Sequence, residues 1–209
     1  SVLGGAANDF VLGDAGNDTL DGGVVNDRIN FTDGNTLSYA GSASGIVMDL
    51  SGITGDGSVG TGTVQDGFGG VDVVSNFPFI TGSSHDDSIK GSSALIFEMF
   101  DGGLGDDTID GGAITDPNAV NSNRITYVNA AEGVHVVLLA GTASGGAGDG
   151  KLSNFHQVRG SAHGDTLEGS ASTITEQFEG RGGNDVIDGR AGFDIVRYDS
   201  ASAGVNVNL

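Results

Sequence analysis

The chain of 209 residues contains no cysteine, no tryptophan and only 2 prolines. Without cysteine no disulfide can stabilise the fold, and so little proline excludes a collagen or a proline-rich spacer. Basic residues are also scarce: 8 lysines and arginines stand against 28 acidic residues, giving a net charge of −20. Because a phosphate backbone needs a basic surface, we expect no nucleic acid partner. Apolar runs are all far shorter than a membrane span, so we expect no membrane insertion.

Glycine, by contrast, is abundant, with 39 residues, and it recurs in a fixed pattern. Residues 13–21 read Gly-Asp-Ala-Gly-Asn-Asp-Thr-Leu-Asp, and units in the same register lie on either side at 4–12 and 22–30. Two further copies stand at 102–110 and 180–188. In every copy an aspartate holds the sixth place and an aliphatic residue the eighth. The chain is therefore a repeat protein rather than a Gly/Asp-rich disordered linker, which would lack a recurring apolar place.

The unit suits a calcium ion. Six loop residues and three strand residues cannot bury an apolar face alone, so copies must stack to build a shared core. Glycine permits the positive φ of a tight turn, which directs carbonyl oxygens inward. Together with the aspartates, two stacked turns offer six or more oxygens, as calcium requires, whereas zinc and copper prefer histidine or cysteine. Without an ion these carboxylates repel one another, so we expect the metal-free chain to be largely unfolded.

These units resemble the nonapeptide repeats of RTX (haemolysin-type calcium-binding) proteins, Gly-Gly-x-Gly-x-Asp-x-aliphatic-x. The resemblance implies a coil of two nonapeptides, with calcium between one loop and the next loop on the same edge. It implies an all-β fold, a parallel β-roll or β-helix solenoid interrupted by longer β-arcs or hairpins and by Gly-rich loops.

The resemblance also implies a set of ligands for several calcium ions. The sixth-place carboxylates are Asp9, Asp18, Asp27, Asp87, Asp107, Asp116, Asp165, Asp185 and Asp194. Backbone carbonyls are expected from Gly13, Gly16, Gly102, Gly105, Gly180 and Gly183. The alternative for each aspartate is that it caps its own turn. His85 and His163 occupy the fourth place of two loops, and we interpret both as loop residues replacing glycine rather than as metal ligands.

A larger repeat encloses the nonapeptides. The segment starting at Gly82 matches that starting at Gly160, 78 residues later, and the same offset relates Asp116 to Asp194. We predict one elongated solenoid over 1–209, composed of a partial first copy at 1–81, a second at 82–159 and a truncated third at 160–209.

Each copy contains an alternating segment: Ile46-x-Met48-x-Leu50, Val134-x-Val136-x-Leu138 and Val205-x-Val207-x-Leu209. Alternation with period two predicts a half-buried strand. The Gly-rich stretches that follow, 51–70 and 140–150, are expected to be surface loops. Helical periodicity is nearly absent.

One irregularity concerns 91–101 and 169–179, which have eleven residues where a nonapeptide has nine. We expect the calcium loop on that edge to be lost. Glu98 and Asp101 resemble the carboxylate pair of a glycoside hydrolase, but they recur by repetition, which a catalytic pair does not need. We therefore expect no enzymatic activity in this chain.

The sequence thus favours a structural, calcium-binding module of a secreted bacterial surface protein, such as an adhesin, a surface layer or an extracellular fibre. It is expected outside the cell or on the bacterial surface, to fold on meeting calcium, and to contact neighbouring copies of itself. The alternative is the C-terminal RTX secretion or folding module of a secreted hydrolase or epimerase, with its active site elsewhere. Carbohydrate binding by the long loops lacks aromatic support, since only 6% of residues are aromatic.

Overall fold

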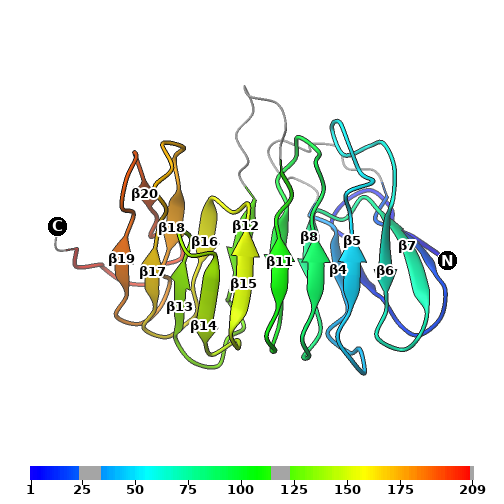
Figure 1. Ribbon diagram of the computed structural model, residues 1–209, viewed down its shortest axis with the longest axis horizontal. Coiled ribbons are helices and arrows are strands. Elements are labelled where there is room, and N and C mark those ends of the chain that lie inside the picture. Colours follow the sequence, from blue (N-terminus) through cyan, green and yellow to red (C-terminus); the bar gives the residue numbers. More distant parts are fainter. Residues whose placement is uncertain (24–33, 114–122, 208–209) are drawn as a thin grey trace.

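Short β-strands joined by tight turns build the protein, whose computed structural model describes residues 1–23, 34–113 and 123–207. Most strands are three residues long, which is the number of strand places in a nine-residue unit. Within these described ranges the chain forms no helix, and most strand pairs are parallel. The prediction of an all-β parallel solenoid is confirmed. Figure 1 shows the strands side by side along the long axis, with the two ends of the chain at opposite ends.

A twelve-stranded sheet forms one wall of the solenoid. Its strands, in spatial order, are β1 (Val2–Leu3), β3 (Thr19–Asp21), β7 (Val71–Ser75), β6 (Gly62–Gln65), β5 (Val47–Asp49), β9 (Ser88–Lys90), β11 (Thr108–Asp110), β15 (Gly150–Ser153), β14 (Thr142–Gly145), β13 (Val134–Val137), β17 (Thr166–Glu168) and β19 (Val186–Asp188).

An eight-stranded sheet, parallel throughout, forms the opposite wall. Its strands, in spatial order, are β2 (Phe10–Leu12), β4 (Thr36–Ser38), β8 (Phe79–Thr81), β10 (Met99–Asp101), β12 (Arg124–Thr126), β16 (Gln157–Arg159), β18 (Gln177–Glu179) and β20 (Ile195–Val196).

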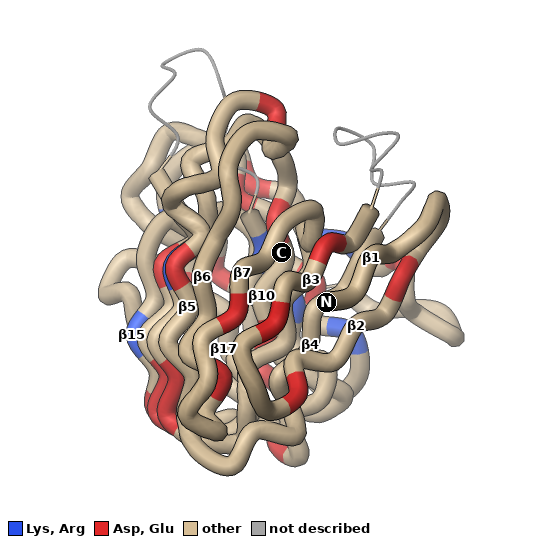
Figure 2. The backbone as a smooth tube through the Cα atoms, turned by 90° about the vertical axis from the view of Figure 1, so that its right-hand side faces the viewer, with Lys and Arg blue, Asp and Glu red and all other residues tan. Residues whose placement is uncertain are grey.

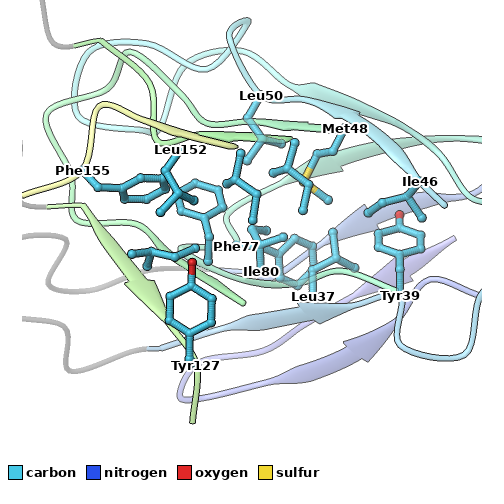
Figure 3. Close-up of a cluster of buried hydrophobic side chains, with 14 of the residues drawn as sticks. Leu37, Tyr39, Ile46, Met48, Leu50, Phe77, Ile80, Tyr127, Leu152 and Phe155 are labelled. Carbon is cyan, nitrogen blue, oxygen red and sulfur yellow. The ribbon is translucent and has the colours of Figure 1, made fainter. Parts of the chain in front are cut away.

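The core lies between the two walls, because the middle residue of each short strand points inward. In the eight-stranded sheet the register places equivalent side chains in a row, with Leu37 beside Ile80 and Ile80 beside Phe100. Met48 and Leu152 face them from the other wall as part of the same buried cluster (Figure 3). Each fully buried aliphatic side chain contributes about 1.5–3 kcal/mol, so the row of middle residues carries much of the fold's stability.

Two antiparallel hairpins interrupt the parallel twelve-stranded sheet. β6 pairs with both β5 and β7, and β14 pairs with both β13 and β15. The expectation that 51–70 and 140–150 are surface loops is therefore wrong in part, because these stretches supply β6 and β14. Each strand buries a single apolar side chain, Val64 or Ala143, which is too weak a pattern to mark a strand in the sequence.

The alternating segment forms its predicted half-buried strand in the first two copies. Ile46, Met48 and Leu50 are each 1% exposed, whereas Val47 between them is 45% exposed. The third copy differs: no strand covers 204–207, and Val205 is 51% exposed. The prediction is wrong there because β5 and β13 pair with a hairpin strand on one side and the next nonapeptide strand on the other, and 204–207 has neither beside it.

Candidate metal sites in the stacked loops

Nonapeptide loops stack along one edge of the twelve-stranded sheet. Ser88 pairs with Thr108, so the residues before them, Asp87 and Asp107, stand side by side in adjacent turns. The pairing of Thr166 with Val186 aligns Asp165 and Asp185 in the same way. Asp and Glu, in red in Figure 2, gather in rows on the turns when the molecule is viewed along its stack. The structure thus places sixth-place aspartates of adjacent turns next to each other, as two pairs.

The turns that carry Gly105 and Gly183 approach the preceding turns so closely that no side chain fits at these two positions. Gly105 has a φ of +121°, and a Cβ there would lie 2.6 Å from the carbonyl carbon of His85 in the neighbouring turn. Gly183 has a φ of +99°, with a Cβ 2.4 Å from the carbonyl carbon of His163. Both values lie in the left-handed region that glycine adopts without strain. The two glycines thereby bring the carbonyl groups of successive turns close together.

One carboxylate oxygen of each paired aspartate links its turn to the turn before. The backbone N–H of Asp87 donates to Oδ1 of Asp107 at 2.9 Å, and that of Asp165 donates to Oδ1 of Asp185 at 3.0 Å. The backbone N–H of Asp18 likewise donates to Oδ1 of Asp72 at 2.8 Å. These bonds fix the carboxylates in the gaps between turns.

The second oxygen of Asp107 and of Asp185 has no such partner. Oδ2 of Asp107 lies close to Gly102, since a Cβ added to that glycine would be 2.1 Å from it. Oδ2 of Asp185 lies equally close to Gly180, where an added Cβ would be 2.2 Å away. In the part of the chain that the structure describes, no hydrogen-bond donor reaches either oxygen. Burial, together with the charges of Asp87, Asp86 and Asp101, raises the pKa of Asp107 to about 7.

Burial and the charge of Asp165 likewise raise the pKa of Asp185. A carboxylate that is buried or half-buried, has an unused oxygen and lies among other acids is what a hard cation stabilises. The residues therefore fit calcium. The structure tests no ion position, so the ligand sets built on these two residues stay predictions.

The comparison with protein families agrees with this chemistry. A model of the RTX calcium-binding nonapeptide repeat matches the chain in four copies, over residues 1–35, 98–113 and 177–197. The chain carries RTX calcium-binding nonapeptide repeats. A search of curated proteins found no match. Among the described residues, no helix has the length and hydropathy needed to cross a membrane.

RTX loops in this chain fall into two types. In the second type serine replaces glycine, and Ser83 satisfies the sixth-place aspartate from within the loop: its N–H and Oγ donate to Asp87 at 2.6 and 2.7 Å. Ser161 does the same for Asp165, at 2.8 Å for both bonds. Both oxygens of these aspartates accept hydrogen bonds, as in the turn-cap alternative, and calcium ligation by Asp87 and Asp165 stays a prediction.

The histidines of these serine loops take part in the turns through their backbone N–H groups. The N–H groups of His85 and His163 donate to the serine hydroxyls at 3.1 and 3.0 Å. Histidine, cysteine, aspartate and glutamate side chains form no cluster of three or more in the described ranges that could hold a metal. The predicted sites combine aspartates with backbone carbonyls, so such a cluster is not required.

The opposite edge, before the strands of the eight-stranded sheet, holds Asp9 and Asp194. Oδ2 of Asp9 accepts the N–H of Gly5 at 2.8 Å, and Oδ1 of Asp194 accepts the N–H of Glu176 at 3.2 Å. Glu98 and Glu176 occupy this place in the eleven-residue units, where Ser92 and Ser170 bond their carboxylates.

The 78-residue offset predicts Asp116 as the counterpart of Asp194, but the strand pairing gives a different counterpart. The strands that follow Asn35, Asn123 and Asp194 occupy equivalent places in the eight-stranded sheet, so these three residues correspond to one another. The amide of Asn35 donates to the carbonyls of Gly22 and Asn76 at 2.6 and 3.2 Å, and its Oδ1 accepts the N–H of Asp9. In the first copy the side-chain amide of Asn35 therefore bonds carbonyl oxygens of the adjacent turns, at the place where the third copy has the carboxylate of Asp194.

Sequence reasoning missed Asn35 and Asn123 because it aligned aspartates. The available signal was their distance from tyrosine: Asn35, Asn123 and Asp194 each precede Tyr39, Tyr127 or Tyr198 by four residues. Asp27 and Asp116 lie outside the described residues.

Asp66 and Asp72 were also missed, because Asp66 lies in the stretch predicted to be a surface loop and Asp72 lies just after it. Asp66 accepts the N–H of Gly16 at 3.1 Å, and Asp72 accepts the hydroxyl of Tyr39 at 2.7 Å. Gly13 packs against this tyrosine, where a Cβ would lie 2.0 Å from Cε1. The loop that carries Asp18 thus rests on a hairpin rather than on another nonapeptide.

Proposed function

We propose that this chain is a structural module of a secreted bacterial surface protein, and that it folds when it binds calcium outside the cell. The observation that carries the proposal is the unused carboxylate oxygen of the buried Asp107 and of the half-buried Asp185, in a chain of net charge −20. Ions between the turns would neutralise both the local and the overall repulsion, so that binding supplies folding free energy. RTX proteins are typically secreted, and extracellular calcium is plentiful.

A non-catalytic role is part of the proposal. Its support is that the carboxylates that resemble a catalytic pair are committed to turns: Glu98 accepts the N–H of Ser92, and Asp101 accepts the amide of Asn129 at 2.8 Å. Both are buried in the wall of the solenoid. A substrate would have to displace the loop hydrogen bonds to reach them.

Circular dichroism tests the proposal directly. The full chain is titrated with calcium after chelation, and the β-signal should rise cooperatively with calcium and vanish again when chelator is added. Size-exclusion chromatography should show the compact form in calcium alone. A β-signal that survives chelation would refute calcium-dependent folding.

Association with neighbouring copies is the second part of the proposal, supported by both ends of the stack. Phe10 and Leu12 in β2 are 67% and 53% exposed, and Val186 in β19 is 62% exposed. These exposed apolar side chains favour contact with a neighbouring copy. Sedimentation in calcium should show a concentration-dependent series of oligomers, whereas a monomer at all concentrations would count against a filament.

A further inference from the structure

Cations gather on one outer face of this acidic chain. Arg124 in β12, Arg159 in β16 and Arg197 after β20 are three of its 8 basic residues. They lie on the eight-stranded sheet, whose strands place alternate residues outside the core. Figure 2 shows how few the blue segments are beside the red ones. A local excess of positive charge on such a molecule calls for an explanation of its own.

Strand pairing brings the three arginines to one place. Arg124 pairs with Gln157, and Arg159 pairs with Glu179 on the next strand. The N–H of Arg197 donates to the carbonyl of Phe178, which carries the row on to β18. Together with Glu179, Asp199 and Ser200, the three guanidinium groups line a hollow of about 250 Å³.

The charges in the hollow do not balance. Arg159 lies 2.9 Å from Oε2 of Glu179, and Arg197 donates to Asp199 at 2.6 Å. Arg124 instead donates from Nε and Nη2 to the neutral Oε1 of Gln157, at 3.1 and 2.7 Å.

The surroundings of Arg124 offer its positive charge no ion-pair partner. Its guanidinium lies 5.1 Å from the centroid of the Phe97 ring, and no carboxylate in the described part of the chain pairs with it. Burial, with repulsion from Arg159 and Arg197, lowers its pKa despite the opposing attraction of Glu179, which already pairs with Arg159. One positive charge in the hollow is therefore without a counter-ion.

The repeat architecture does not require these arginines. In the first copy Thr36 holds the ladder position of Arg124, and Thr81 holds that of Arg159. Since the stack forms with threonine at these positions in one half, the solenoid does not need arginine there in the other. Both positions at which arginine replaces threonine line the hollow, which favours a binding role over a structural one.

We propose that this hollow binds an oxyanion, a carboxylate or a tetrahedral anion, that completes the charge of Arg124. Two of the five N–H groups of the Arg124 guanidinium bond Gln157, which leaves three for the oxygens of such a group, and Arg159 and Arg197 flank it. The surrounding acidic surface repels extended polyanions, so a single charged group is the ligand. The source is either a free oxyanion or a sugar acid, which share this chemistry.

Isothermal titration calorimetry of the calcium-loaded full chain tests the site with three probes: selenate, galacturonate and neutral galactose. Selenate and galacturonate should bind, and galactose should not. Equal affinity for the two anions identifies a free oxyanion, and ten-fold tighter galacturonate identifies a sugar acid. Anomalous diffraction from selenium should place selenate within hydrogen-bond distance of Arg124.

Arg124→Gln should weaken anion binding at least ten-fold. Arg197→Gln, at a more exposed side chain, should weaken it several-fold and serves if the first variant fails to fold. Arg190→Gln is the matched control, because Arg190 bonds Glu168 on the other sheet, and it should change binding less than two-fold. Absence of binding by both anions, or equal loss in the control, would overturn the proposal.

Discussion

At the scale of single residues, the residue at the second place of a loop determines which hydrogen bonds its sixth-place aspartate accepts. Where the second place is glycine or arginine, as before Asp107 and Asp185, one carboxylate oxygen stays free of donors within the described structure. Where serine takes the second place, as before Asp87, its N–H and hydroxyl use both oxygens. Identical aspartates in equivalent turns therefore have different capacities for a cation, and the distinction follows from one side chain.

Asp107→Asn tests this at a glycine-type loop. The amide keeps the bond from the N–H of Asp87 but loses the charge that faces the turn. We expect the calcium midpoint for folding to rise about ten-fold, corresponding to about 1.4 kcal/mol. Calcium titration monitored by circular dichroism measures it. The control is Asp14→Asn, an exposed loop residue whose loss removes the same charge. Equal shifts in both variants would mean that only net charge matters.

Glu98 gives a prediction about pH. Burial raises its pKa to about 7 from the usual 4.5, so the folded state holds a proton that the unfolded state releases. Stability contributed by the neutral form is complete below about pH 4.5 and is lost as the pH rises toward 7, by up to about 3 kcal/mol.

Glu98→Gln removes this titration while its carbonyl oxygen still accepts the N–H of Ser92. Urea unfolding in saturating calcium should show the variant gaining stability over the parent chain between pH 5 and pH 8. A constant difference across that range would show that Glu98 is not protonated in the fold.

At the scale of elements, the glycine turn sets the spacing of the stack. Gly105→Ala forces a side chain into positive φ and toward the backbone of His85. The strain and the clash together should destabilise the calcium-bound protein by about 2–4 kcal/mol. Gly5→Ala, with no atom within 4 Å of its added Cβ, is the control and should cost under about 0.5 kcal/mol. Comparable losses in urea unfolding would show that turn geometry is not the cause.

The sequence predicted the parallel solenoid because a period of nine repeats the same apolar place, and the buried row through Ile80 and Phe100 follows from it. It could not predict the hairpins, since β6 and β14 each offer one buried apolar residue. It also misassigned the third copy, where Gly189 and Asp194 are five residues apart while Gly111 and Asn123 are twelve apart. Pairing between distant strands, and not local pattern, determines such alignments.

At the scale of the whole molecule, the question is whether calcium acts as a specific ligand or only as a screen for the charge of −20. At 1 M monovalent salt the screening length is about 3 Å, so repulsion between turns is nearly removed. We expect 1 M sodium chloride to leave the chelated chain without β-signal, while millimolar calcium folds it. Magnesium should be far less effective, because it demands a stricter octahedron. Folding in sodium chloride alone would show that screening suffices.

The central claim is that calcium ions lie between stacked turns and hold the solenoid together. A crystal structure of the calcium-loaded chain, with anomalous diffraction to identify the metal, tests it most directly. The account predicts calcium within about 2.3–2.6 Å of an oxygen of Asp107 and of Asp185, with carbonyl oxygens completing each site. A well-ordered solenoid with no ion at either carboxylate would contradict it.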